Sequence, residues 1–261
     1  MKELNGRELA GYVKERQSHQ AKALKSRKMV PKLAIFYDND SPVIAKYMQL
    51  KKTYGADIGV EVEITKITPD DAVKKIQTAA SDAKVTGIIV QLPLKDVSMD
   101  VLDLIPLDKD VDGMRWMESG VMPATVRAVT TLLAKIERET RDSLANKRIV
   151  VVGARGAVGR PLTFYLKKLG YSQVIEVEWD TDNQAEIIRS GEVVISCTGK
   201  TGLIGQEMVQ PGSIVIDVGA PRGDMMKEVY EKAGVAVPVP NGVGPVTIAM
   251  LMTNAVELVV K

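Results

Sequence analysis

The sequence contains the stretch Arg148-Ile-Val-Val-Val-Gly-Ala-Arg-Gly-Ala-Val-Gly-Arg-Pro161. Its opening, Arg148 to Val152, is a largely β-branched run that predicts a buried strand, and Leu162 to Gly170 continues in a helical pattern. Glycines between a strand and a helix let the backbone turn tightly and approach a pyrophosphate, whose charge meets free N–H groups at the helix N-terminus. The stretch therefore predicts a dinucleotide-binding turn that contains Gly153, Gly156 and Gly159.

The glycines are spaced GxxGxxG, which differs from the GxGxxG of the general fingerprint, so a glycine-rich turn without a ligand is the alternative. The next predicted strand ends near Glu178 and Asp180, about 25 residues beyond Gly153. An acidic side chain there would bind an adenosine ribose 2′-hydroxyl and repel the extra phosphate of NADP, unless it is only a solvated strand end. Arg155 could instead pair with that phosphate. The choice between NAD and NADP therefore stays open, and the two carboxylates favour NAD.

Short apolar runs alternate with helical patterns along almost the whole chain, which is typical of a parallel α/β architecture. The stretch Pro106 to Thr125 lacks this periodicity and is interpreted as a domain junction. The predicted strands are Lys32 to Tyr37, Val60 to Thr65, Gly87 to Gln91, Arg148 to Val152, Gln173 to Glu178, Glu192 to Cys197 and Ser213 to Val218.

Helices are expected over Ser41 to Tyr54, after Thr68, near Arg127 to Glu139 and from Pro245 onward. In the second of these, Thr68 is expected as the N-cap and Pro69 as the first helical residue. The apolar stripe expected on the first helix consists of Val43, Tyr47, Leu50 and Tyr54.

Composition excludes several kinds of site. With one histidine, His19, and one cysteine, Cys197, the chain lacks the residues for a Cys/His zinc site, a Cys-His dyad or a disulfide framework, and no metal site is expected. The 35 Lys+Arg and 33 Asp+Glu are scattered, which gives no electrostatic footprint for nucleic acid. No apolar run approaches the ~18 to 20 residues of a membrane helix, and the charged N-terminus lacks a signal-peptide core, so a cytoplasmic location is expected.

Four residues in the first half are candidates for chemistry. Lys51 follows Tyr47 by one helical turn, and partial burial beside the ring would lower the pKa of its amine. The alternative is a lysine that extends from a helix edge into solvent. Gln91 ends a predicted buried strand, where ligands of open α/β sheets bind. Asp112 lies in the junction, where an Asx-turn with the following glycine is the alternative.

Six motifs occur in the order and approximate spacing of the bifunctional methylenetetrahydrofolate dehydrogenase/methenyltetrahydrofolate cyclohydrolase family, which the chain resembles over essentially its whole length. The motifs are Tyr47-Met-Gln-Leu-Lys51, Val90-Gln-Leu-Pro-Leu94, Lys109-Asp-Val-Asp-Gly113, the Gly153 to Pro161 turn, Ile216-Asp-Val-Gly219 and Pro238-Val-Pro-Asn-Gly-Val-Gly-Pro-Val-Thr247.

The resemblance implies an N-terminal α/β folate-binding domain over residues 1–122 and a Rossmann-like NAD(P)-binding domain over residues 123–245. A C-terminal helix within residues 246–261 would pack back toward the first domain. It also implies a homodimeric cytoplasmic enzyme of one-carbon metabolism. Such an enzyme oxidises 5,10-methylenetetrahydrofolate to 5,10-methenyltetrahydrofolate with a nicotinamide cofactor, usually NADP, and hydrolyses the product to 10-formyltetrahydrofolate.

Residue roles follow from the same resemblance. Lys51 resembles the family's catalytic lysine, Tyr47 the tyrosine that stacks on the folate, Gln91 the glutamine that tunes the lysine and Asp112 the aspartate that anchors the pterin. The positions that match cofactor contacts are Gly153, Ala154, Arg155 and Ala220, and those expected at the folate cleft are Gly242, Val243, Gly244 and Pro245.

Some positions depart from the family pattern. Gly153-Ala-Arg155 replaces the usual Gly-Arg-Ser, and Glu178-Trp179 stands where many members have His-Ser near the 2′-phosphate. Three alternatives are therefore kept: a shikimate- or amino-acid-dehydrogenase-like enzyme, a dehydrogenase with weakened cyclohydrolase activity, and a non-catalytic folate- or nucleotide-binding paralogue. The combination of Tyr47, Lys51, Gln91 and Asp112 argues against the first and third. The ratio of the two activities, the polyglutamate preference and the roles of Trp116 and Trp179 stay open.

Overall fold

In the computed structural model, which describes residues 2–260, the chain folds into two compact units. Within the described residues, the three-stranded unit consists of Gly11–Ala124 and residues 248–260, and the six-stranded unit consists of residues 2–10 and Thr125–Thr247. The division differs from the expected one at the N-terminus. Here β1 (Lys2–Glu3) pairs with β9 (Val235–Val237), so residues 2–10 belong with the six-stranded unit.

The three-stranded unit is built on a parallel sheet with the strand order β3-β2-β4. Its strands are β2 (Lys32–Tyr37), β3 (Glu61–Lys66) and β4 (Gly87–Val90). Its helical segments are α1 (Gly6–Ser26), α2 (Pro42–Ile58), α3 (Ala72–Ser81), η1 (Met99–Leu104), η2 (Leu107–Lys109), α4 (Trp116–Ser119) and the later part of α9 (Val243–Leu258).

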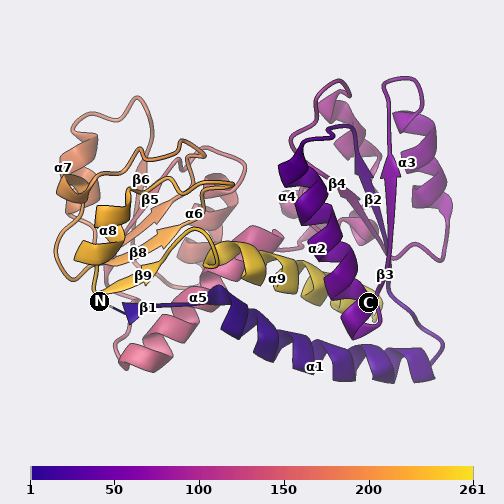
Figure 1. Ribbon diagram of the computed structural model, residues 1–261, viewed down its shortest axis with the longest axis horizontal. Coiled ribbons are helices and arrows are strands. Elements are labelled where there is room, and N and C mark those ends of the chain that lie inside the picture. The colour runs from indigo at the N-terminus through magenta and orange to yellow at the C-terminus, as the bar shows by residue number, and fades with distance from the viewer. Residues whose placement is uncertain (1, 261) are drawn as a thin grey trace. The chain divides into compact units, whose positions relative to one another are not determined.

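Both faces of the central strand β2 are buried: Leu33 to Phe36 are all buried, and successive strand residues point to opposite sides. Leu33 and Ile35 of β2 join a core cluster with residues of α1, α2 and α9, whereas Ala34 and Phe36 join a second cluster with α3 and η1. Figure 1 accordingly shows α2 and α3 on opposite sides of β2. The carboxyl ends of the strands are left free of these layers and are available to carry functional side chains.

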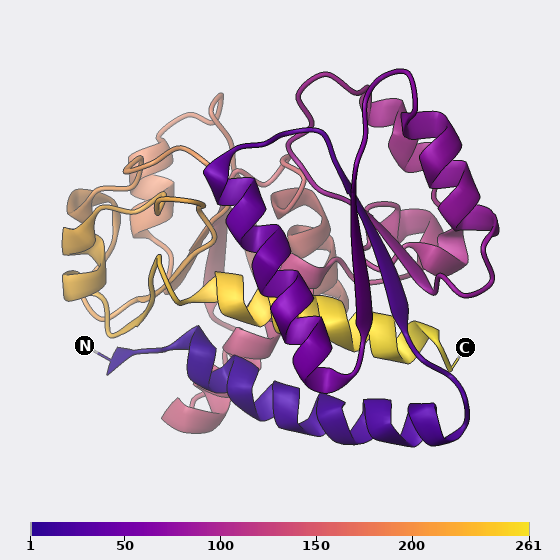
Figure 2. The same ribbon diagram turned by 45° about the vertical axis from the view of Figure 1, so that its right-hand side comes forward.

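A buried glutamine connects three helices of this unit. The Nε2 of Gln17 on α1 donates to the carbonyl of Ala249 and to the hydroxyl of Thr253 on α9, both at 2.7 Å. Its Oε1 accepts from the hydroxyl of Tyr54 on α2 at 2.9 Å. Figure 2 shows the resulting side-by-side course of α1 and α9. These bonds use both N–H groups and the oxygen of the amide, which is why a glutamine can be fully buried here.

The six-stranded unit is a parallel sheet with the order β1-β9-β8-β7-β5-β6. Its further strands are β5 (Arg148–Val152), β6 (Gln173–Val177), β7 (Val193–Ser196) and β8 (Ile214–Asp217). The strand order reverses between β5 and β7, and ligands of open α/β sheets bind outside the carboxyl ends at such a point. Its helical segments are α5 (Ala124–Thr140), α6 (Gly159–Lys168), α7 (Gln184–Arg189), η3 (Gln206–Met208) and α8 (Lys227–Lys232).

The seven strands expected from the sequence are confirmed, each to within one residue at either end. The expected apolar stripe of α2 is wrong. The buried residues are Ile44, Met48, Lys51, Gly55 and Ile58, whereas Val43 and Leu50 are 38% and 44% exposed. The helix also continues to Ile58 and ends at Gly59, whose φ of 84° closes the C-terminus.

The expected start of α3 is wrong as well. Thr68 and Pro69 precede the helix, Asp71 is its N-cap and Ala72 its first residue. Asp71 accepts the N–H of Thr68 at 2.9 Å and pairs with Lys75 at 2.7 Å, so a turn is formed before the helix begins. The pair β1 and β9 was absent from the sequence prediction because two or three residues are too few for a periodicity to show.

No helix within residues 2–260 is both long enough and apolar enough to cross a membrane.

Candidate active site

Lys51 lies on the buried side of α2 and is only 8% exposed. The helix is oriented from its start by Ser41, whose hydroxyl accepts the N–H of Ile44, and by Pro42 in the first turn. Because the buried face follows Ile44 and Met48 rather than Val43 and Leu50, it carries the lysine inward. The alternative of a lysine reaching into solvent from a helix edge is therefore wrong.

Gln91 follows directly after β4 and holds the amine of Lys51. Its backbone N–H donates to the carbonyl of Phe36 at 2.8 Å, which places the residue at the carboxyl edge of the sheet. Its Oε1 accepts from the Nζ of Lys51 at 2.9 Å, while its Nε2 donates to the carbonyl of Leu92 at 2.8 Å. The bond to Leu92 fixes the orientation of the amide, so that the lysine meets an acceptor.

Asp38, which the sequence reasoning missed, anchors the loop that follows Gln91. Its buried carboxylate accepts the backbone N–H groups of Lys95, Asp96 and Val97 at 2.8 to 2.9 Å. Burial raises the pKa of Asp38, but these three donors outweigh it and leave the pKa below its ordinary value. An acidic residue directly after a strand was the available signal, although such residues are common in solvated turns.

The two carboxylates of the junction have different roles. Asp110 is buried and accepts the N–H groups of Met114 and Arg115 at 2.9 Å and the hydroxyl of Ser119 at 2.8 Å, so it folds the loop around itself. No hydrogen bond from the described part of the chain ends on the Asp112 carboxylate, which acts on Lys51 through its charge. Asp112 is thus the carboxylate available to a ligand.

Helix α9 fixes the backbone on either side of this carboxylate. The Nδ2 of Asn254 donates to the carbonyl of Val111 at 2.9 Å and to that of Met122 at 3.1 Å. Lys109, in the same motif, connects the junction to α3, because its Nζ donates to the carbonyls of Ala80 and Asp82 at the end of that helix. The position of Asp112 is therefore set by contacts distributed over three elements.

Burial changes the proton affinity of the groups around Lys51. It lowers the pKa of the Lys51 amine, and the Asp112 carboxylate partly opposes this change. It raises the pKa of Asp112, with Lys51 opposing and Asp110 adding to the rise. Burial also raises the pKa of Tyr47, one turn before the lysine. Both Lys51 and Asp112 are shifted toward their neutral forms, which suits groups that exchange protons with a reactant.

The glycine turn of the six-stranded unit is shaped by close backbone contacts. Gly153 has a φ of 79°, and a Cβ there would lie 2.9 Å from the carbonyl oxygen of Cys197. A Cβ on Gly159 would lie 2.1 Å from the carbonyl oxygen of Gly153. Gly153 requires a glycine for its conformation and Gly159 for space, so the first and last glycines of the GxxGxxG motif follow from the way the start of α6 meets the end of β5.

The same turn offers donors to an anion. Across residues 2–260, no protein acceptor is bonded to the backbone N–H groups of Ala157, Val158 and Gly159. These groups open helix α6, where unsatisfied N–H groups and the helix dipole favour a phosphate. The residues present therefore fit a dinucleotide.

Acidic side chains at the end of β6 occupy the rim of this turn. The backbone N–H of Arg155 donates to the Glu178 carboxylate, and its guanidinium pairs with Asp180 over 2.9 Å. Trp179, between the two acids, is 77% exposed. The arginine that could meet a 2′-phosphate is thus already paired with a carboxylate.

The remaining candidate positions lie in the same unit as the glycine turn. Ala220 follows β8 and is exposed, Gly242 directly precedes α9, and Val243 to Pro245 begin that helix. Their contacts with cofactor and folate stay predictions. Trp116 lies half-buried on α4 in the other unit.

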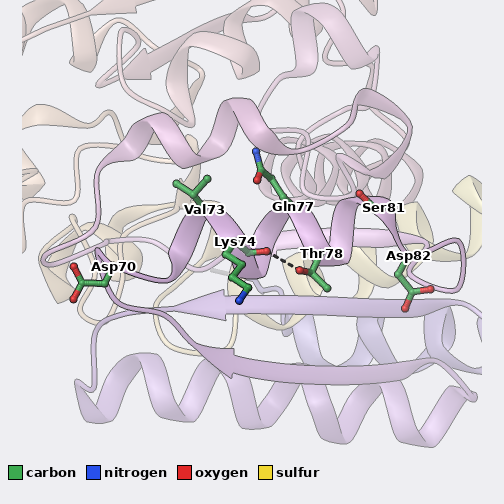
Figure 3. Close-up of a pocket in the computed structure, with 7 residues that line it drawn as sticks. All are labelled: Asp70, Val73, Lys74, Gln77, Thr78, Ser81 and Asp82. Atoms are coloured by element: carbon green, nitrogen blue, oxygen red, sulfur yellow. Dashed lines mark hydrogen bonds between the residues drawn. The ribbon is translucent and has the colours of Figure 1, made fainter.

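A shallow depression of about 680 Å³ lies on the outer side of α3 (Figure 3). The only hydrogen bond drawn among its lining residues runs from the hydroxyl of Thr78 to the carbonyl of Lys74 at 2.8 Å, within the helix. None of the candidate residues lines it. Across the described chain, no group of three or more His, Cys, Asp or Glu side chains is placed to hold a metal ion.

Comparison with known proteins was made for both sequence and structure. The family model described as tetrahydrofolate dehydrogenase/cyclohydrolase, catalytic domain, matches residues 4–112, and that of the NAD(P)-binding domain matches residues 123–261. The chain is 32% identical to the bifunctional protein FolD of an Exiguobacterium species, over 98% of this chain and 97% of that protein.

Solved structures of similar proteins have the same fold. The bifunctional FolD enzyme of Campylobacter jejuni superposes with a TM-score of 0.89 at 32% identity, covering 99% of this chain and 98% of that one. The Trypanosoma brucei FolD, solved with NADP and an inhibitor, gives a TM-score of 0.87 at 26% identity, with 98% and 96% covered. The chain therefore belongs to the tetrahydrofolate dehydrogenase/cyclohydrolase family, and its cofactor is a nicotinamide dinucleotide.

Proposed function

We propose that this protein oxidises 5,10-methylenetetrahydrofolate to 5,10-methenyltetrahydrofolate and hydrolyses the product to 10-formyltetrahydrofolate. The observation that carries the proposal is the buried amine of Lys51, hydrogen-bonded to an oriented Gln91 and facing the charge of Asp112. Membership of the family supports both activities.

The hydrolytic step requires an acid and a base. Water adds to the cationic methenyl carbon and gives up one proton, and the bond from that carbon to N5 breaks as N5 takes a proton. The remaining hydroxyl proton leaves to solvent, so the formyl group stays on N10 and one proton is released overall. A neutral Lys51 accepts the proton from water and returns it to N5, and burial lowers its pKa toward the range in which it can do both. Gln91 holds the amine in one place throughout.

Asp112 and Tyr47 position the substrate. The Asp112 carboxylate accepts no hydrogen bond from residues 2–260 and suits the N–H groups on the edge of a pterin ring. Tyr47 is half-buried and offers its ring for stacking one turn from the lysine. Binding energy at these two residues holds the reacting carbon near the amine.

The oxidative step uses the glycine turn. The N–H groups of Ala157, Val158 and Gly159 would hold the pyrophosphate, and the second oxygen of Glu178 would accept from a ribose hydroxyl. The nicotinamide dinucleotide supplies the hydride acceptor when it is bound.

We further propose a preference for NAD over NADP. A 2′-phosphate at this rim would meet the carboxylates of Glu178 and Asp180, while the guanidinium of Arg155 is engaged with Asp180. The positive charge of Arg155 is therefore already neutralised by Asp180 before a phosphate binds.

Homodimerisation and a cytoplasmic location are proposed from the family resemblance. Light scattering of the purified protein tests homodimerisation.

The experiment is an absorbance assay of purified protein with methylenetetrahydrofolate and either NAD or NADP, which follows the formation and decay of the methenyl product. We expect both phases, with a higher kcat/KM for NAD. Formation without decay would leave a dehydrogenase alone, absence of both phases would indicate a binding paralogue, and a strong NADP preference would contradict the role given to the acidic rim.

A further inference from the structure

Two fully buried carboxylates lie at the carboxyl edge of the six-stranded sheet, outside the residues discussed so far. Asp217 ends β8, and Asp224 lies in the loop that follows it. Neither forms an ion pair with a basic side chain in residues 2–260. Because burying unpaired carboxylates costs free energy, their retention calls for a specific role in this loop.

Asp217 organises its own loop. Its Oδ1 accepts the N–H groups of Gly219 at 2.8 Å and Asp224 at 3.0 Å. Its Oδ2 accepts the N–H of Met225 at 2.9 Å and the hydroxyl of Tyr230 at 2.6 Å. These four donors, which lie between Gly219 and Tyr230, fold this loop back over the end of β8 and present the Asp224 side chain to the neighbouring strand.

Asp224 then holds the end of β7. Its Oδ2 accepts the hydroxyl of Ser196 at 2.8 Å and the backbone N–H groups of Thr198 and Gly199 at 2.7 and 3.2 Å. Its Oδ1 has no partner among the described residues. All three bonds therefore depend on one oxygen, and they fix the segment from Ser196 to Gly199.

That segment is the surface on which the glycine turn rests. A Cβ on Gly153 would lie 2.9 Å from the carbonyl oxygen of Cys197 and 3.2 Å from the Cα of Thr198, so the two backbones are in direct contact. A displacement of Thr198 would move Gly153, and with it the N–H groups that open α6. The chain of contacts from Asp217 through Asp224 and Thr198 reaches the pyrophosphate-binding turn.

We propose that Asp224, itself held by Asp217, is a positioning residue that sets the geometry of the cofactor's pyrophosphate turn. The inference rests on the proposed placement of the dinucleotide at Gly153 to Gly159. It assigns the two buried carboxylates to cofactor affinity, and it separates them from the hydrolytic chemistry, which consumes no cofactor.

The test compares three variants in the full-length protein, with cofactor KM, dehydrogenase kcat and cyclohydrolase rate measured separately. Asp224→Ala removes the acceptor of three bonds and leaves the buried Ser196 hydroxyl and the part-buried N–H groups of Thr198 and Gly199 without that partner, so we expect a cofactor KM raised by about tenfold or more. The kcat at saturating cofactor and the cyclohydrolase rate should stay within about twofold.

Asp224→Asn supplies the conservative variant. Its amide oxygen can keep the three bonds while its NH2 group takes the place of the unpartnered Oδ1, so the cofactor KM should return to within about twofold of the original. The control is Ser213→Ala, because Ser213 is buried in the same unit and its hydroxyl has no partner in the described structure. It should leave cofactor KM unchanged.

A role confined to stability predicts a different result, because a partly unfolded population lowers kcat at an unchanged KM. That outcome, or an unchanged KM in Asp224→Ala, would overturn the proposal. If Asp224→Ala does not fold, Ser196→Ala decides, since it removes one of the three bonds and should raise the KM about threefold. An unchanged KM in that variant would also contradict it.

Failure of the underlying cofactor site is distinguished by Gly159→Ala. Its Cβ would collide with the Gly153 carbonyl in the turn itself. If Gly159→Ala raises the cofactor KM and Asp224→Ala does not, only the positioning role is wrong. If neither changes it, the dinucleotide does not bind at this turn.

Discussion

The Nζ of Lys51 donates to the Oε1 of Gln91 over 2.9 Å, and the other end of the same amide is held by the Leu92 carbonyl. A neutral acceptor thus holds the amine without stabilising its charge as a carboxylate would. Burial can therefore keep the pKa of Lys51 below its ordinary value. This relationship determines at which pH the lysine can act as a base.

The substitution Gln91→Glu should reverse that effect. A carboxylate beside the amine favours its charged form and raises the pKa of Lys51, so the protonated lysine persists to higher pH. We expect the acid limb of the cyclohydrolase pH–rate profile to move to higher pH by about one unit or more, with a rate lower at pH 7 and restored in alkaline buffer.

Asp112→Asn provides the opposite control. Burial lowers the pKa of Lys51, and the Asp112 carboxylate opposes this shift. Removing that carboxylate should lower the pKa of Lys51 further, so the acid limb of the pH–rate profile should move to lower pH, whatever happens to substrate affinity. Limbs that stay in place in both variants would show that Lys51 does not control the profile.

The Arg155–Asp180 ion pair should govern the discrimination against NADP. Asp180→Ala removes one negative charge from the rim and frees the guanidinium, so kcat/KM for NADP should rise about five- to tenfold while that for NAD changes little. The double variant Asp180→Ala/Arg155→Ala should lose the gain. Equal NADP use by the single and double variants would mean that Arg155 does not meet the phosphate.

Gly159 should be intolerant of a single methyl group. In Gly159→Ala, the Cβ would lie 2.1 Å from the Gly153 carbonyl oxygen, which forces α6 away from β5. Steady-state assays should show a loss of dehydrogenase kcat/KM of about 100-fold with the cyclohydrolase rate preserved. Gly11→Ala, on a helix with open space around it, is the matched control and should be neutral.

The buried face of α2 can be checked by stability. Ile44→Ala should lower the free energy of unfolding by about 3 kcal/mol, because the residue is buried against the core. Leu50→Ala, at a position 44% exposed, should change it by less than about 1 kcal/mol. Chemical denaturation of the two variants gives both values. Similar decreases in the free energy of unfolding would mean that Leu50 is as buried as Ile44, as the sequence pattern predicts.

The strands were predictable because most of them are short apolar runs rich in β-branched residues, which is the local signal that a buried parallel strand leaves. The buried faces of the helices were harder to predict. Val43 and Leu50 are apolar but exposed on α2, while a lysine and a glycine occupy the buried face, so hydrophobicity alone selected the wrong stripe. The burial of Lys51 reflects function rather than propensity.

The candidate site likewise contains residues that the sequence predicts and residues that it does not. Residue types and order marked Lys51, Gln91 and Asp112, and the structure joins the first two by a hydrogen bond and the first and third by charge. The roles of Asp38 and Asp224 could not be read from the chain. Each binds backbone N–H groups more than 20 residues away, and no local pattern records which loop a carboxylate will hold.

The central claim is that Lys51 carries the hydrolytic step, and Lys51→Met tests it most directly. Purified variant and wild type are given methenyltetrahydrofolate, and the decay of its absorbance is compared with that of a Lys52→Met control, altered at the neighbouring exposed lysine. We predict decay no faster than the uncatalysed rate in Lys51→Met, with folding stability unchanged or raised because a buried amine is removed. Hydrolysis by Lys51→Met at the wild-type rate would contradict the account.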